Sequence, residues 1–181
     1  MNQDTVHYLN MFLGAGAIAL QIVSLVVILV LIFHKGENKL LAFIKKQFLL
    51  LGFILSIIPA IFSLIYSDVL NYAACHLCWL QRVFMFPQTF LFGMALWKKD
   101  RGVMKYSFLL LFVGTLISIY HNLFYYFGEA TNLPCDASGV SCYQHLVSEF
   151  GGYISIPMLA LTGFISLLTL MAVAYFYNQE E

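Results

Sequence analysis

Long, uninterrupted apolar stretches constrain the fold of this chain more than any other feature of its sequence. Each has roughly the 20 residues that a helix rising ~1.5 Å per residue needs to cross a hydrocarbon core of ~30 Å. They do not alternate apolar with polar residues, so membrane strands are a poor alternative. The sequence therefore predicts an all-α integral membrane protein with five transmembrane helices. The five stretches are Leu9–Phe33, Phe48–Ser67, Trp79–Trp97, Tyr106–Phe127 and Ile154–Tyr177.

The composition excludes a water-soluble domain. Hydrophobic residues make up 61% of the chain and charged residues only 10%, which leaves too little polar surface to cover a soluble fold. The formal net charge is zero, so the chain lacks the basic face that binding to nucleic acid requires. We therefore expect membrane lipid to be its solvent and no nucleic acid among its partners.

The positions of the basic residues predict the orientation of the helices. Apart from Arg82, every Lys and Arg lies in the first or the third connection between the predicted helices, whereas the second and fourth connections have none. Because basic loops stay in the cytoplasm, we expect the amino terminus outside and the carboxyl terminus in the cytoplasm. The residues concerned are Lys35, Lys39, Lys45, Lys46, Lys98, Lys99, Arg101 and Lys105.

The first apolar stretch also has to be weighed as a signal peptide. A signal peptide has a basic segment followed by a shorter apolar core. No Lys or Arg precedes Lys35, and the stretch Leu9–Phe33 is long. We therefore expect it to be retained as a transmembrane helix.

All four cysteines fall in the connections that the charge pattern places outside. Cys75 and Cys78 lie in the second connection, and Cys135 and Cys142 lie in the fourth. The outer side of a bacterial cytoplasmic membrane is oxidising and permits disulfides. The even number, the paired spacing and the common side indicate two extracytoplasmic pairs that are either redox-active or structural.

The first pair lies where a short outer loop enters the third predicted helix. We expect Cys78 in or beside the first turn, where unpaired backbone N–H groups and the helix dipole stabilise a thiolate. Arg82 follows four residues later and therefore shares a helical face with Cys78. An arginine within a membrane helix is costly and is a functional candidate. Here it could stabilise a thiolate or the anion of a reduced electron acceptor.

The residue pattern alone leaves other interpretations open. The cysteines could form two static disulfides or a zinc centre, although the six-residue gap between Cys135 and Cys142 is wider than the usual ligand spacing. A metal site could also use His76. Arg82 could simply extend its charged group to the outer headgroups. The polar loop of the second pair could present its disulfide to a soluble protein. Alternatively, the disulfide could serve only to hold the loop together.

The segment Cys75-His-Leu-Cys-Trp-Leu-Gln-Arg82, followed two helices later by the second cysteine pair, resembles the DsbB family of thiol:quinone oxidoreductases. The short loop with Cys135 and Cys142, and the segment Phe150-Gly-Gly-Tyr-Ile-Ser-Ile-Pro157 after it, look most similar to the BdbC-like branch. The resemblance covers about Phe48 to Tyr177. Vitamin K epoxide reductases have a similar bundle, but their Cys-x-x-Cys pair follows the loop pair instead of preceding it.

This resemblance implies a membrane enzyme that re-oxidises a soluble, thioredoxin-fold, DsbA-like thiol oxidase and passes the electrons to a quinone, either ubiquinone or menaquinone. Cys75 and Cys78 would match the pair that reduces the quinone, with Cys78 nearest the ring. Arg82 would match the family's quinone-contacting arginine. The partner's thiolate would attack Cys135, and Cys142 would exchange with Cys75.

His121 lies near the outer end of the fourth predicted helix, at about the place of the family's quinone-proximal histidine. A polar residue at the membrane interface, beside Tyr120 and Asn122, is the alternative interpretation.

Residues 1–47 have no counterpart in the family's four-helix pattern. We expect an extra N-terminal helix and its cytoplasmic connection there, beside a four-helix bundle over residues 48–181. The extra helix could pack laterally, hold a partner or do neither. The competing function is a non-enzymatic membrane module with two static extracytoplasmic disulfides.

Overall fold

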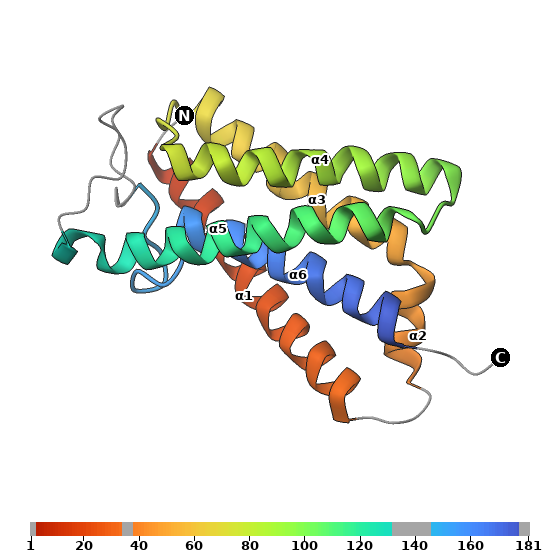
Figure 1. The fold of residues 1–181 in the computed structure, drawn as a ribbon. Helices are drawn as coiled ribbons and strands as arrows, with labels where there is room; N and C mark the ends of the chain where they lie inside the picture. The colour runs from red at the N-terminus through yellow and green to blue at the C-terminus, as the bar shows by residue number, and fades with distance from the viewer. Residues whose placement is uncertain (1–2, 34–37, 132–145, 178–181) are drawn as a thin grey trace.

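The computed structural model describes residues 3–33, 38–131 and 146–177. Within these ranges every regular element is a helix, as the continuous apolar stretches predict. The elements are α1 (Gln3–Phe33), α2 (Lys39–Lys46), α3 (Phe48–Leu64), the π-helical turn η1 (Ile65–Val69), α4 (His76–Lys98), α5 (Val103–Thr131) and α6 (Ile156–Phe176) (Figure 1).

Helices α3 to α6 form a four-helix bundle. Helix α4 packs between α3 and α5, and α6 packs against both α3 and α5. Two glycines allow the close contacts, since Gly52 faces the ring of Phe92 and Gly114 faces the ring of Phe164, and a Cβ at either position would clash. The core between the helices is formed by Phe48, Met85, Phe92, Leu111, Phe164, Leu167, Leu170 and Met171.

Helix α1 lies outside this bundle and packs on α6, while the short helix α2 connects α1 to α3. Figure 1 shows α1 diverging from the bundle toward the end where α2 lies. The side chain of Asn38 caps α2 by accepting a hydrogen bond from the backbone N–H of Leu40. Leu41 is fully buried against Val27 and Val173, so α2 packs against the C-terminal half of α1 and the end of α6.

Four of the described helices are long and apolar enough to cross a membrane: α1, α3 with η1, α5 and α6. The predicted span Trp79–Trp97 corresponds to α4, which is not among them, so the prediction of five spans is not confirmed. Helix α4 is less apolar because it contains Gln81, Arg82 and Gln88. Gln81 and Gln88 are nonetheless buried inside the bundle.

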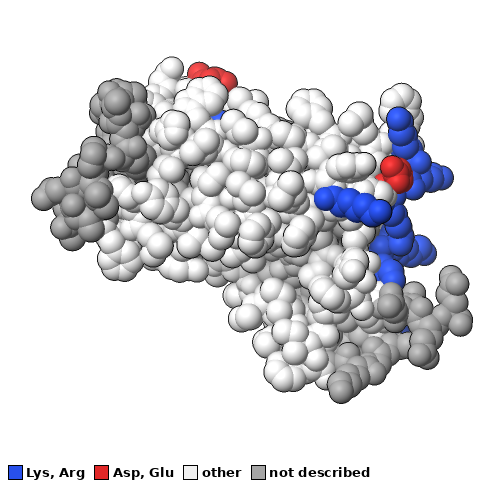
Figure 2. All heavy atoms as spheres, in the orientation of Figure 1, with Lys and Arg blue, Asp and Glu red and all other residues white. Residues whose placement is uncertain are grey.

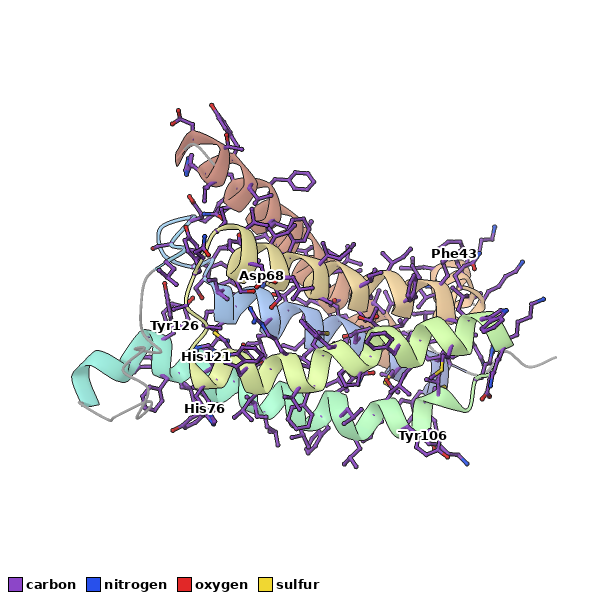
Figure 3. The ribbon with its side chains drawn as sticks, turned by 90° about the horizontal axis from the view of Figure 1, so that it is seen from above. Phe43, Asp68, His76, Tyr106, His121 and Tyr126 are labelled. Atoms are coloured by element: carbon purple, nitrogen blue, oxygen red, sulfur yellow. The ribbon has the colours of Figure 1, made fainter. Side chains whose placement is uncertain are left out.

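The two ends of the bundle differ in charge. Lys and Arg side chains gather at one end, around α2 and the turn between α4 and α5 (Figure 2). The opposite end carries His76, where α4 begins, together with His121 and Tyr126 of α5 (Figure 3). Apart from Arg82, which belongs to α4 itself, the basic residues therefore lie far from the start of α4.

Candidate active site

The first cysteine pair forms a dithiol at the start of α4. Cys75 is the residue that directly precedes the helix, and Cys78 lies in its first turn, as the spacing predicts. Both are free thiols, with Cys75 buried and Cys78 half-buried, and their sulfur atoms are 3.3 Å apart. A change of side-chain rotamer would bring two sulfurs at this separation to the ~2.05 Å of a disulfide bond.

His121 of α5 lies directly beside Cys75. Its ring is 1% exposed, and its Nε2 is 3.7 Å from the sulfur of Cys75. The other ring nitrogen, Nδ1, is 3.3 Å from Oε1 of Gln81, whose amide nitrogen donates to Ser118 Oγ at 3.1 Å. Because an amide oxygen can only accept, this network places the proton of neutral His121 on Nδ1. Nε2 is then free to take the proton of the Cys75 thiol.

These surroundings favour the thiolate of Cys75, which lies just outside the membrane helix. The pKa of Cys75 is lowered to about 4, chiefly by the hydrogen bond with the Cys78 thiol and also by His121, while burial acts in the opposite direction. The positive end of the α4 dipole acts in the same direction. Since the thiolate is the reactive form in thiol–disulfide chemistry, Cys75 is suited to close the disulfide with Cys78.

Replacement of His121 should raise the pKa of Cys75. In the reduced wild-type protein, the ultraviolet absorbance of the Cys75 thiolate should persist at neutral pH and disappear only as the pH falls through about 4. In His121→Gln, this loss should occur at a higher pH, displaced by about one pH unit, because a hydrogen bond and a nearby charge are removed. Tyr120→Phe, a change on an exposed side chain next to His121, is the control. Identical titrations of the two variants would contradict this role.

Arg82 is held by α3 rather than left free at the surface. Its Nε donates to Ser63 Oγ at 2.8 Å and a terminal nitrogen donates to the Ser63 carbonyl at 2.9 Å. Its guanidinium also lies over the ring of Trp79, 5.1 Å from the centroid. These contacts fix the charge of Arg82 one turn below Cys78. A side chain extended toward the lipid headgroups would not hold its charge at this place.

A cavity of about 490 Å³ opens beside Cys78 and Arg82, which both line it. Its walls come from α1, α3, α4 and α6, with few polar groups. Cys75 and His121 are not among its lining residues, so of the two cysteines only Cys78 borders the cavity. Cys78 faces the cavity, and Cys75 faces His121. Other residues around Cys78 that line it are Ser63, Tyr66, Tyr72, Gln81, Met85 and Phe86.

The same geometry could also hold a metal ion. Ligand atoms of Cys75, Cys78 and His121 all lie within 4.8 Å of one another, and two sulfurs with one imidazole are a donor set that zinc accepts. His76, which the sequence offered for such a site, is exposed and does not belong to this group. Geometry alone therefore admits both uses of the pair.

The structure brings together four of the six residues singled out from the sequence: Cys75, Cys78, Arg82 and His121. Cys135 and Cys142 lie in the segment 132–145, outside the described residues. Two partners had no signal in the sequence: Ser63, which holds Arg82, and Ser118, which orients Gln81 toward His121. A serine in an apolar helix is too common to indicate such a role. Gln81, one turn below Cys78, is a weak candidate from the sequence, and its contact with His121 becomes visible only in the structure.

The fold and this site define a multi-pass membrane protein with two closely spaced free thiols at one end of its bundle. The family model "Disulfide bond formation protein DsbB" matches residues 45–176. The chain therefore belongs to the DsbB family and is a membrane oxidoreductase that generates disulfides and exchanges them with a partner protein.

Curated relatives agree with this assignment. The chain is 30% identical over 138 residues to "Probable disulfide formation protein C 2" of Bacillus anthracis, covering 76% of this chain and 97% of the relative. It is 33% identical over 124 residues to "Disulfide bond formation protein C" of Bacillus subtilis, covering 68% and 89%. These names confirm the resemblance to the BdbC-like branch. No solved structure gives a significant match to the chain.

Proposed function

We propose that this protein re-oxidises an extracytoplasmic, DsbA-like thioredoxin-fold oxidase and passes the electrons to a membrane quinone. The observation that supports this proposal most directly is the position of the two cysteines. Cys78 lines an apolar cavity together with Arg82, whereas Cys75 lies beside the buried His121. Such a division suits a pair that receives electrons on one side and delivers them on the other.

The cavity fits a quinone. Its volume of about 490 Å³ lies within the ~300–1,000 Å³ of small-molecule sites, its walls suit an apolar tail, and Arg82 offers a charge for the ring oxygens. A bound ubiquinone or menaquinone would accept the two electrons and two protons released when the two thiols join as a disulfide. Cys78 would lie nearest the ring, Arg82 would stabilise negative charge there, and His121 would take the proton of Cys75 at Nε2.

We further propose that α4 is a fifth span, with the amino terminus outside. Helix α4 packs along both α3 and α5, and burial of Gln81 and Gln88 hides their polar groups from lipid. The basic residues gather at one end of the bundle (Figure 2), which by the charge rule would be cytoplasmic. The dithiol then faces the outer side of a bacterial cytoplasmic membrane.

The second cysteine pair completes the proposed relay. The partner returns as a dithiol, its thiolate attacks Cys135, and Cys142 leaves as a thiolate. A second attack by the partner closes its own disulfide and leaves Cys135 and Cys142 reduced. Exchange of Cys142 with the Cys75–Cys78 disulfide then moves the two electrons to the first pair. These roles rest on the family resemblance and on the two cysteines being the only others in the sequence.

Capture of the mixed disulfide tests the partner half of this proposal. In Cys142→Ala, the Cys135 thiolate can attack the disulfide of the oxidised partner, and no Cys142 is present to displace the partner afterwards. Cells quenched with acid should therefore accumulate a covalent complex with a thioredoxin-fold protein, identified by mass spectrometry. Cys135→Ala is the matched control and should give no such complex. Equal trapping by the two variants, or a complex with unrelated proteins only, would contradict the assignment of Cys135.

A further inference from the structure

Helix α1 is an addition to the family domain, yet it forms part of the cavity at the dithiol. The family model begins at residue 45, after α1 and most of α2. Five residues of α1 nevertheless line the same cavity as Cys78 and Arg82. They occupy one helical face and are Phe12, Leu13, Gly16, Ala17 and Leu20.

Hydrogen bonds to the segment before α6 and to α6 itself hold α1 in this place. Gln21 donates to Thr162 Oγ1 at 2.7 Å and accepts from the hydroxyl of Tyr153 at 2.9 Å. One turn further along, Ser24 donates to Ser166 at 3.2 Å. Polar contacts of this kind, between helices in an apolar solvent, fix both the rotation and the depth of a helix. The face with Gly16 is therefore directed at the cavity by specific contacts.

The outer end of α1 is fixed as well. His7 Nδ1 is 3.0 Å from a carboxylate oxygen of Glu149, and Gly14 lies against the ring of Phe150 so closely that a Cβ would clash. The hydroxyl of Tyr66, which lines the cavity, donates to Asn10 Oδ1 at 2.6 Å in a buried contact. Helix α1 thus closes the cavity near the start of α4.

The wall that α1 supplies is apolar and long. From Phe12 to Leu20 the helix rises by eight residue steps, about 12 Å, which is more than the ring of a quinone alone needs. Gly16 lies in the middle of this wall, and a Cβ built there would meet no atom within 4 Å. The space beside Gly16 is therefore open, and the absence of a side chain keeps it so.

We propose that α1 is a substrate-specificity element, whose face from Phe12 to Leu20 holds the isoprenoid tail of the quinone while the ring lies at Cys78 and Arg82. The proposal rests on the proposed quinone reduction and deepens it. The family bundle supplies the dithiol and the arginine, and the added helix supplies the surface that the tail contacts. Selection among quinones then depends on a segment that the family domain lacks.

Filling the space beside Gly16 tests this assignment. The purified, full-length protein would be assayed with a tailed quinone and with the same ring without a tail. Gly16→Leu should raise KM for the tailed quinone by about 10-fold or more, the effect of a misfitting side chain in an apolar pocket, and change KM for the tailless ring by less than about 2-fold. Ala15→Leu makes the same kind of change on an exposed position outside the cavity and should leave both KM values unchanged.

A second measurement uses the unaltered chain and so does not depend on the folding of a variant. A quinone with a photoreactive group on its tail should label α1 between Phe12 and Leu20. If Gly16→Leu and Ala15→Leu have the same KM for each quinone, or if labelling is confined to other helices, the role of α1 is overturned while the proposed quinone reduction stands. Failure of the wild-type protein to reduce either quinone would overturn the proposed function itself.

Discussion

Cys78→Ser should abolish quinone reduction, with a loss of more than about 1,000-fold in turnover, as for other residues that react covalently. Without the Cys78 sulfur, Cys75 has no partner within the pair. The two electrons that formation of the Cys75–Cys78 disulfide would release therefore cannot pass toward the cavity that Cys78 lines. The measurement is the decrease in quinone absorbance when the purified variant is mixed with its reduced partner. The second pair should become reduced and stay reduced.

Val83→Ser is the matched control for this result. It places the same side chain on α4 at a position that is 58% exposed and away from the cavity, so its turnover should stay close to that of the wild type. Turnover of Cys78→Ser at the wild-type level would show that the electrons bypass Cys78. The proposed separation of the two sulfurs would then be wrong.

Arg82→Gln should raise KM for the quinone by about 10- to 100-fold. The reason is the loss of charge at the cavity, because hydrogen bonds to a charged group contribute about 1.5–3 kcal/mol, and about 1.4 kcal/mol corresponds to a factor of ten. Arg82→Lys should recover only part of the effect, since one ammonium group cannot reproduce both contacts with Ser63 and the planar fork of arginine.

Lys98→Gln removes the same charge at the other end of α4, where the side chain is exposed. Its KM should be that of the wild type, which separates a local effect of Arg82 from a change in net charge. Equal KM values for Arg82→Gln and the wild type would contradict a role at the quinone. In that case the contacts with Ser63 would be structural only.

The sequence predicted the elements of this fold well, because membrane helices are defined by length and apolarity. The four most apolar helices lie where the hydropathy placed them. Helix α2 was not predicted, since eight residues cannot span a membrane and the segment was interpreted only as a basic connection. Its apolar residues, among them the buried Leu41, become recognisable as an amphipathic helix only beside α1 and α6.

The sequence predicted the part of the site that is formed by neighbouring residues of one helix, but not the contacts between residues far apart in the chain. The placement of Cys78 and Arg82 on one face follows from helical spacing, which local sequence contains. The contact between Cys75 and His121 joins residues 46 positions apart and depends on the rotation of α4 against α5. The cavity depends on the packing of α1 on α6. Because α1 is apolar on all sides, its sequence does not show which of its faces contacts α6.

The divergence of α1 from the bundle gives the cavity its shape. Helices α1 and α3 both pack on α6, and the space between them is lined from both sides. A site of this kind, bounded by several helices with mostly apolar walls, suits a ligand that arrives from the bilayer. The metal alternative uses the same dithiol and makes a different prediction, since stoichiometric zinc in the purified protein would occupy the thiols that the redox cycle needs.

In the proposed function, electrons pass from a protein dithiol through this chain to a quinone. The direct test places the wild-type protein in lipid vesicles with a quinone, adds the reduced thioredoxin-fold partner, and follows quinone absorbance together with the free thiols of the partner. We expect one quinone to be reduced for each partner disulfide formed. Partner oxidation with no loss of quinone, or no oxidation at all, would contradict the account.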